Sequence, residues 1–315
     1  MLGLFQKHKV REPIVVREEE PLEPEGSSET TELELTNVGP YEIQAPIGTG
    51  GMGTVYKALD RRRDLTVAIK VLDRRYDVDR KRRRRDYLGR EVLIAASLHH
   101  KNIIRMHKDI IEQPDRDGNV RRCLLMEYID GHNLRRHIVK RDLSLRQMLH
   151  ICIELCEGLD FLHQHNVVHR DIKPENFLFS RDGKQIKIVD FGLSKCDANW
   201  RTRWLHEGGG TRRYMSPEQL ARKRLDARSD LFSFGITIYE LLSGKHPCSG
   251  STASEIVRQI RSSRYRFPPP SEHNPEIPPA LDRIVLKALR RKPEHRYQSM
   301  TEMLLDLTRM AESRI

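Results

Sequence analysis

The chain has 315 residues, 37% of them hydrophobic and 32% charged, which is long and apolar enough for a sizeable core in one large or two ordinary domains. Its formal net charge is +11, but the basic runs are scattered and are not interleaved with aromatic residues, which argues against nucleic-acid binding as the primary function. Five cysteines without C-x-x-C spacing argue against a disulfide framework or a zinc site, and no run approaches the roughly 20 apolar residues that span a bilayer. We therefore expect a cytoplasmic protein with no membrane segment in this chain.

Residues 1–40 differ in composition from the rest of the chain. They hold nine glutamates against four basic residues, with several prolines and few aromatic residues. Such a segment buries too little apolar surface to offset the entropy lost on ordering, so we expect a disordered acidic tail. An alternative is that the tail lies against the basic run Arg80–Arg85 and modulates the helix that follows. Unchanged activity and salt response after deletion of residues 1–38 would exclude this alternative.

From Tyr41 onward, short β-rich runs flank a glycine-rich loop, Gly48–Gly53, which is followed by Val55. Glycines at 48, 50 and 53 let a backbone approach phosphate groups closely. The pattern G-x-G-x-x-G also marks dinucleotide-binding folds, but there the loop opens a helix. Here β-branched residues resume directly and lead to Val67-Ala68-Ile69-Lys70, which favours a phosphate-binding loop between two strands.

A helix is predicted around Glu91, because apolar residues recur with it at intervals of three and four. Glu91 is the one glutamate between Glu42 and Glu112, which makes it the candidate carboxylate for holding Lys70. Asn102–Met106 then reads as a strand, and Glu112–Arg122 as a polar hairpin loop with Asp117-Gly118 as its turn. Next, an apolar strand, Cys123–Tyr128, runs into an acidic connector that contains Gly131.

The most informative stretch is His169–Asn176, which is followed by Asp190-Phe191-Gly192. It supplies a carboxylate that can accept a proton (Asp171), a cation two residues later (Lys173), and two oxygen ligands for a hard metal (Asn176 and Asp190). These groups suit phosphoryl transfer, where positioning and charge neutralisation supply most of the rate. An apolar stripe from Leu145 to Leu162 predicts a buried helix before this stretch.

The C-terminal third is expected to be helical. A segment rich in basic and small residues ends at Ser216-Pro217-Glu218, and Ser229–Leu242 is apolar almost all round, which predicts a core helix. A last helix is expected over Met300–Met310.

Taken together, the motifs resemble those of the eukaryotic-type (Hanks-type) serine/threonine protein kinases. The H-R-D-x-K-P-x-N stretch and D-F-G stand fourteen residues apart, after G-x-G-x-x-G-x-V and V-A-I-K and before S-P-E, over about 275 of the 315 residues. The sequence Met-Glu-Tyr-Ile-Asp-Gly at 126–131, which would form the hinge between the lobes, and the S-P-E-Q variant look most like the bacterial branch. The resemblance implies an α+β, two-lobed kinase fold over 41–315. It has a small β-rich N-lobe with an αC helix (about 41–128) and a larger, mainly helical C-lobe (about 129–315).

The same resemblance implies roles for individual residues. Asp171 would be the base for the substrate hydroxyl, Lys173 would meet the γ-phosphate, and Asn176 and Asp190 would hold Mg²⁺, or alternatively Mn²⁺. Met126 would be the gatekeeper behind the adenine, and a Lys70–Glu91 ion pair would mark the active arrangement. The residues implied to surround the nucleotide are Ile47, Gly48, Gly50, Gly53, Val55, Ala68, Lys70, Glu91, Met126, and the backbones of Glu127 and Ile129.

Regulation is implied for the segment between D-F-G and S-P-E. Arg170 would hold a phosphate placed there, and Thr202 is the leading phosphosite candidate. Thr211 is expected to bond Asp171 and Lys173. Arg296 matches the arginine that pairs with the glutamate of S-P-E, Glu218. Asp230, at the start of the predicted core helix, looks like the family's anchor for the backbone of His169–Asn176, although a carboxylate there could equally be a helix cap.

The sequence thus predicts an ATP- and magnesium-dependent serine/threonine protein kinase that acts on protein substrates, including its own activation loop in trans, and that does not bind nucleic acid. A second hypothesis is a pseudokinase scaffold that binds nucleotide or a partner without turnover. A third is a nucleic-acid-binding protein that uses its basic body.

Overall fold

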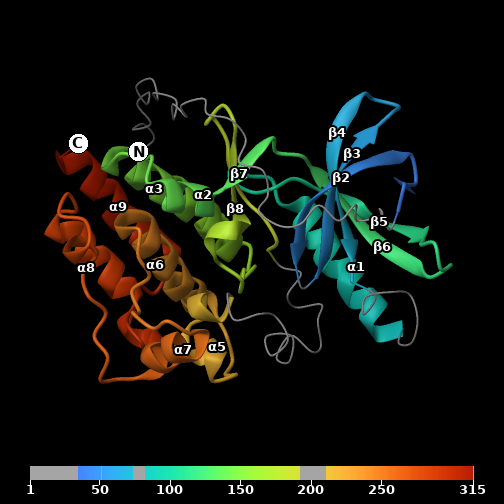
Figure 1. Ribbon diagram of the computed structural model, residues 1–315. Coiled ribbons are helices and arrows are strands. Elements are labelled where there is room, and N and C mark those ends of the chain that lie inside the picture. The colour runs from blue at the N-terminus through green and yellow to red at the C-terminus, as the bar shows by residue number, and fades with distance from the viewer. Residues whose placement is uncertain (1–34, 51, 74–81, 192–210, 315) are drawn as a thin grey trace, which may run out of the picture.

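A computed structural model of the chain describes residues 35–50, 52–73, 82–191 and 211–314. The described part has two regions, one built around an antiparallel sheet and one mainly helical (Figure 1). A single helix, α1 (Arg82–Ser97), packs against β5 of the sheet, and the remaining α-helices belong to the other region. This arrangement confirms the expected two-lobed α+β fold.

The first region is a six-stranded sheet with the strand order β1-β2-β3-β4-β6-β5, in which every neighbouring pair is antiparallel. Alternation along β4 gives the sheet two different faces. Ile69 and Val71 belong to a small apolar cluster on one face, whereas Ala68, Lys70 and Leu72 point to the other. The strands are β1 (Asn37–Val38), β2 (Tyr41–Gly50), β3 (Gly53–Asp60), β4 (Leu65–Leu72), β5 (Met106–Pro114) and β6 (Val120–Glu127).

The glycine at position 53 is required by the packing of the sheet itself. Gly53 has φ +135°, and a Cβ there would lie 2.0 Å from Val71 O. By contrast, a Cβ at Gly48 or Gly50 would meet no atom of the described residues within 4 Å. Within the described part of the chain, the space beside Gly48 and Gly50 is therefore open, whereas Gly53 is fixed by the neighbouring strand.

The folded region begins earlier than the predicted boundary at residue 41. Val38-Gly39-Pro40-Tyr41 forms a tight hairpin in which Val38 pairs with Tyr41, and Gly39 has φ +55°. Leu35 and Val38 are buried, at 5% and 0% exposure. Assigning residues 35–40 to the tail was therefore wrong, because they complete the apolar cluster of the sheet. The predicted disorder of residues 1–34 lies outside what the structure describes. Of the basic run Arg80–Arg85, residues 80 and 81 and the side chains of residues 82–85 also lie outside it, so the proposed contact with the tail stays a prediction.

The strand predicted over Asn102–Met106 is also wrong. Ile103 makes only an isolated parallel bridge with Ile188, and β5 begins at Met106 and continues to Pro114. The hairpin turn is where the sequence predicted it. Asp115 Oδ1 accepts hydrogen bonds from Asp117 N at 3.0 Å and Asn119 N at 2.8 Å, while Gly118 takes φ +81°.

The second region is organised around two helices with buried faces, α3 and α6. In α6 every residue from Ser229 to Ser243 is buried, as its apolar sequence predicted. A three-stranded sheet, β7-β8-β9, lies beside these helices, and no helix within the described ranges is long and apolar enough to cross a membrane. The remaining elements are β7 (Gly131–Asn133), α2 (Leu134–Lys140), α3 (Leu145–Gln164), β8 (Phe177–Ser180), β9 (Ile186–Ile188), α5 (Pro217–Leu220), α6 (Ala227–Ser243), α7 (Ala253–Arg261), α8 (Pro279–Ala288) and α9 (Met300–Arg314).

Candidate active site

The register of the sheet collects the predicted nucleotide residues on one face. Directly paired residues of antiparallel strands point the same way. Val55 pairs with Gly48 on one side and Lys70 on the other, and Ala68 pairs with Met126. Ala68 and Lys70 are two residues apart on β4, so all five positions share one face. Ile47 lies next to Gly48 on β2 with 48% of its surface exposed.

Lys70 joins this face of the sheet to the segment after β9. Its ammonium Nζ lies 2.7 Å from Asp190 Oδ1, and Lys70 is only 3% exposed. Burial by itself would raise the pKa of the Asp190 carboxyl, but the nearby charges of Lys70, His169 and Lys173 lower it below its ordinary value. Asp190 is therefore ionised at neutral pH.

Glu91 lies on the inner side of α1. Leu88 and Ala95, one turn before and after it, are 2% exposed, and Glu91 itself is 8% exposed. Among the contacts between described residues, Lys70 pairs with Asp190, so the expected Lys70–Glu91 ion pair stays a prediction.

The loop His169–Asn176 holds three polar side chains in mutual contact. Asn176 Nδ2 donates to Asp171 O at 2.6 Å and to Asp171 Oδ2 at 3.2 Å. Lys173 Nζ lies 3.3 Å from the same carboxylate oxygen. Asp171 Oδ2 thus faces two donors, and within the described part of the chain Oδ1 has no such partner.

A second carboxylate, that of Asp230, holds the backbone of this loop in place. Asp230 accepts hydrogen bonds from His169 N at 2.7 Å, from Arg170 N at 2.8 Å and from His163 Nε2 at 2.8 Å. The helix cap is Asp226, which accepts from Arg228 N. Asp230 is therefore the anchor of the loop, and the alternative that it serves as a cap is wrong.

The loop is tied in turn to the segment that carries Asp190. His169 Nε2 lies 2.9 Å from Val189 O, and Val189 N donates to Asn176 O at 3.0 Å. Asp190 and Arg170 both adopt positive φ, +60° and +69°. Such backbone costs about 1 kcal/mol or more per non-glycine residue and persists where surrounding contacts determine it.

Asn176 and Asp190 fit a hard cation by the chemistry of their remaining oxygens. Because Asn176 Nδ2 makes both hydrogen bonds of that amide, its Oδ1 is left to face a cation. Lys70 contacts only Oδ1 of Asp190. Magnesium is commonly held by one or two protein ligands together with substrate phosphates. That mode suits a site with the two oxygen ligands of Asn176 and Asp190. The described residues contain no group of three or more His, Cys, Asp or Glu that could hold a metal.

The connector between the two regions begins at the end of β6. Met126 and Ile129 are partly buried and pack against the larger apolar core. Glu127 N already donates to Arg105 O at 3.0 Å, so any adenine contact of the Glu127 backbone has to use its carbonyl. The Glu127 side chain is engaged as well, since its Oε1 lies 3.0 Å from Lys187 Nζ.

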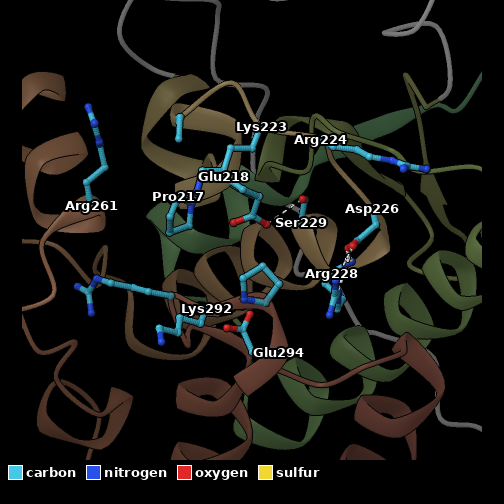
Figure 2. Close-up of a pocket in the computed structure, with 13 residues that line it drawn as sticks. Pro217, Glu218, Lys223, Arg224, Asp226, Arg228, Ser229, Arg261, Lys292 and Glu294 are labelled. Carbon is cyan, nitrogen blue, oxygen red and sulfur yellow. Dashed lines mark hydrogen bonds and ion pairs between the residues drawn. The ribbon is translucent and has the colours of Figure 1, made fainter.

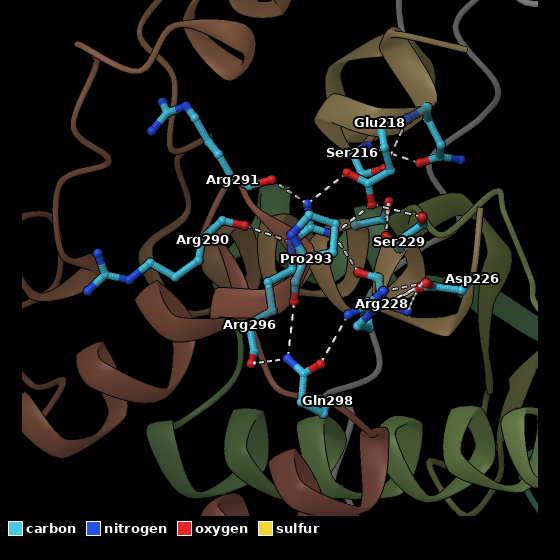
Figure 3. A network of polar contacts seen from close by, with 12 residues as sticks. Ser216, Glu218, Asp226, Arg228, Ser229, Arg290, Arg291, Pro293, Arg296 and Gln298 are labelled. Atoms are coloured by element: carbon cyan, nitrogen blue, oxygen red, sulfur yellow. Dashed lines mark hydrogen bonds and ion pairs between the residues drawn. The ribbon is translucent and has the colours of Figure 1, made fainter. Parts of the chain in front are cut away.

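The predicted pair of Glu218 and Arg296 is present and buried. Ser229 Oγ donates to Glu218 Oε1 at 2.8 Å (Figure 2), and Arg296 binds the two carboxylate oxygens through Nη1 and Nη2 at 2.7 and 2.8 Å (Figure 3). Arg296 also donates to backbone carbonyls of residues 228, 290 and 291. The pair therefore ties α5 to the segment before α9.

Sequence reasoning missed four polar contacts near the loop. Gln219 on α5 donates from Nε2 to Arg170 O at 2.9 Å. On α2, Arg135 reaches Glu175 at 2.9 Å and Glu240 at 3.1 Å, and Tyr214 donates to Glu240 at 2.6 Å. No local pattern marks these residues, because their partners stand 26 to 105 positions away.

Two regulatory predictions stay untested by the geometry. Thr202 lies outside the described residues, and so does the side chain of Thr211, whose backbone starts a short 3₁₀ turn, Thr211–Tyr214. Gly192 of the D-F-G motif is outside as well, while Phe191 is 1% exposed within the core.

Comparison with known proteins points to one family. A family model described as the protein kinase domain matches residues 41–306. The chain is 36% identical over 277 residues to the serine/threonine-protein kinase PknB of Mycolicibacterium smegmatis, covering 86% of this chain and 43% of that protein. It is 37% identical over 275 residues to the probable serine/threonine-protein kinase SCO3848 of Streptomyces coelicolor, covering 85% and 39%. The chain thus spans about two fifths of the length of these relatives.

Solved structures agree at the level of the fold. A crystal structure of a mutant of the PknI kinase domain of Mycobacterium tuberculosis gives a TM-score of 0.65 at 24% identity. It covers 89% of this chain and 98% of that chain. A double mutant of the same domain gives 0.63 at 25% identity, covering 86% and 96%.

Proposed function

This chain belongs to the protein kinase family, and we propose that it transfers the γ-phosphoryl group of ATP to serine and threonine hydroxyls of protein substrates. The observation that carries the proposal is one connected set of contacts. Lys70 reaches Asp190 across 120 positions, Val189 N bonds Asn176 O, and Asn176 reaches Asp171. A strand, a catalytic loop and a metal-ligand segment therefore meet at one place.

Asp171 is the proposed acceptor of the substrate's proton. Asn176 and Lys173 hold its Oδ2, which leaves Oδ1 to take the proton as the hydroxyl oxygen bonds to the γ-phosphorus. The bond from that phosphorus to the oxygen bridging to the β-phosphate breaks, and ADP leaves with the oxygen. Lys173 and Lys70 supply positive charge where negative charge gathers on the phosphate oxygens.

The nucleotide is proposed to lie against the shared face of the sheet. Gly48 and Gly50 offer open backbone for phosphates, and Val55, Ala68 and Met126 offer apolar surface for the base. Ile47, Gly53, Glu91, Glu127 and Ile129 complete the proposed nucleotide site. When bound, magnesium, or manganese in its place, neutralises phosphate charge, and Asn176 and Asp190 are the residues that would hold it.

We further propose that this kinase phosphorylates its own activation segment in trans, at Thr202, with Arg170 as the cation that holds the phosphate. Thr211 is proposed to bond Asp171 and Lys173. The proposed location is the cytoplasm. Four cysteines in the described part, at 123, 152, 156 and 248, are free and buried, which suits a reducing compartment.

Incubation with labelled ATP, magnesium and a mixture of unphosphorylated proteins tests the proposed activity. We expect label on serine or threonine, and a loss of at least about 100-fold in Asp171→Asn, because the amide cannot accept the proton. Asp182→Asn is the matched control, since Asp182 is an exposed carboxylate on the turn after β8. Nucleotide binding by the wild-type chain without any transfer would instead favour a pseudokinase scaffold.

A further inference from the structure

A basic pocket lies against α5, outside the proposed phosphoryl-transfer site (Figure 2). Its volume is about 520 Å³, and its walls come from α5 and the segment after it, the start of α6, the end of α7 and residues 291–294. None of the residues proposed for ATP, metal or catalysis lines it. Its lining cations are Lys223, Arg224, Arg228, Arg261, Arg291 and Lys292.

The carboxylates of this basic pocket are mostly committed to other partners. Glu218 binds Arg296, which is not a lining residue. Asp226 binds Arg228 at 2.7 Å. Among the described residues the other five lining cations form no ion pair, and Glu294 is the one lining carboxylate left to balance them. The basic pocket therefore carries excess positive charge.

Arg291 is the most firmly held of these cations. It donates to Ile260 O at 2.9 Å and to Gln259 O at 3.0 Å, and its guanidinium lies 4.5 Å from the centre of the Phe267 ring. Burial lowers the pKa of Arg291, and the described contacts include no carboxylate that stabilises its charge. The two carbonyls take Nε and one N–H of Nη2, so the remaining N–H groups of this fixed guanidinium are the ones that can receive an anion.

We propose that the basic pocket binds a phosphorylated serine or threonine side chain of a protein partner. A phosphate carries nearly two charges and three acceptor oxygens at neutral pH, so it can engage several cations at once, whereas a carboxylate carries one charge. The choice of a phosphorylated protein as the partner rests on the proposed kinase function. The binding of a phosphate group in the basic pocket does not depend on that function.

The basic pocket is also connected to the catalytic loop. Glu218 lines the pocket and stands next to Gln219 on α5, and Gln219 bonds Arg170 O, one residue before Asp171. A phosphoprotein held in the pocket would therefore rest against the element that touches the proposed catalytic loop. The pocket would select partners that already carry a phosphate elsewhere in their sequence.

Binding is tested with the Asp171→Asn chain, so that no transfer occurs. The probe is a fluorescent Gly/Ser peptide with one central phosphothreonine. Two comparison peptides carry threonine or glutamate at that position. We expect the phosphopeptide to bind. The double variant Arg261→Ala with Lys292→Ala should weaken it at least about tenfold, or about 1.4 kcal/mol, because it removes two of the cations that would face the phosphate.

The control removes the same charge from exposed arginines that do not line the pocket, Arg283→Ala with Arg290→Ala, and should leave binding unchanged. Equal weakening by both double variants, equal binding of the glutamate peptide, or no binding at millimolar peptide would each overturn the proposal. So would retention on phosphatidylserine vesicles that depends on Arg261 and Lys292 without phosphopeptide binding. Because no turnover is needed, these results are independent of the transfer assay.

Discussion

At the scale of single residues, the proposed site depends on a carboxylate that touches no substrate. Asp230 is 1% exposed and faces three donors, two of them backbone N–H groups of the catalytic loop. Burial opposes its ionisation, but the hydrogen bond and charge of His163 lower the pKa of Asp230 below its ordinary value. Asp230 is thus an ionised positioning residue for Asp171.

Replacing this residue should cost both stability and activity. Asp230→Ala leaves buried N–H groups of His169 and Arg170 without an acceptor, so we expect a loss of about 3 kcal/mol in the free energy of unfolding. Phosphoryl transfer should fall with it, because the loop loses its anchor. Asp226→Ala is the control on the same helix. It removes an exposed cap and should cost about 1 kcal/mol with transfer nearly intact. Equal losses in urea titrations of the two variants would contradict the assigned roles.

Single residues show how far motif spacing can predict contacts. The pairing of Glu218 with Arg296 was predicted correctly although they stand 78 positions apart, because both belong to recognised motifs. The contacts of Gln219 and Arg135 were not predicted. Gln219 was noted only as the last residue of S-P-E-Q, Arg135 belongs to no motif, and the partners of both come from other elements. Polar contacts made by tertiary packing leave no periodic signal in the sequence.

At the scale of elements, a central strand was easier to predict than an edge strand. β4 is buried from Ala68 to Leu72, and its β-branched V-A-I-K sequence marked it as a strand. β5 was largely missed, because it is an edge strand whose residues His107–Asp109 are exposed and polar. Its strand character comes from pairing with β6. The requirement for glycine at position 53 also comes from a neighbouring strand, because a side chain there would collide with the backbone of Val71.

The short helix α5 depends on its link to Arg296. Burial would raise the pKa of the Glu218 carboxyl, but the hydrogen bonds and charge of Arg296 lower it below its ordinary value. A carboxyl whose pKa is lower in the folded state contributes stability above its unfolded pKa of 4.5. That contribution is lost as pH falls through the folded value.

The link predicts a pH-dependent effect of Glu218→Gln. At pH 7 the variant leaves Arg296 buried beside a neutral amide and should lose about 3 kcal/mol of unfolding free energy. The difference from wild type should shrink as pH falls below 4.5, because wild-type Glu218 then becomes neutral too. Urea titrations from pH 7 to pH 3 measure it. A difference that stays constant over this range would show that the Glu218 charge does not stabilise the fold.

At the scale of the whole molecule, the order of the motifs predicted the two regions but not the residue at which the folded region begins. Composition drew the boundary at residue 41, because the acidic residues before it dominate the average. The structure continues the sheet back to Asn37 through a two-residue turn at Gly39-Pro40, and Leu35 before it packs in the apolar cluster. That dipeptide is a turn signal in the sequence, and Leu35 and Val38 on its near side are apolar. The basic pocket was likewise beyond prediction, since its cations come from four separate segments.

The earlier boundary makes a pair of truncations informative. Deleting residues 1–34 keeps every described residue of the apolar cluster, and we expect the free energy of unfolding to stay within about 0.5 kcal/mol of the full chain. Deleting 1–40 also removes Leu35 and Val38, which uncovers Ile43 and Tyr56 in the same cluster. We expect a loss of about 3 kcal/mol from these two side chains, measured by thermal and urea unfolding.

Point variants in the full chain separate burial from chain length. Leu35→Ala with Val38→Ala should reproduce most of the loss, whereas Asn37→Ala, at an exposed position of β1, should not. If deletion of 1–40 is as stable as deletion of 1–34, β1 does not contribute to the sheet. Activity adds a second readout, because β2 pairs with β1 at one end and carries Gly48 and Gly50 at the other. Removing β1 should therefore weaken nucleotide binding only to the extent that it destabilises β2. If a variant binds nucleotide less tightly but is as stable as wild type, residues 35–40 act on the nucleotide site directly.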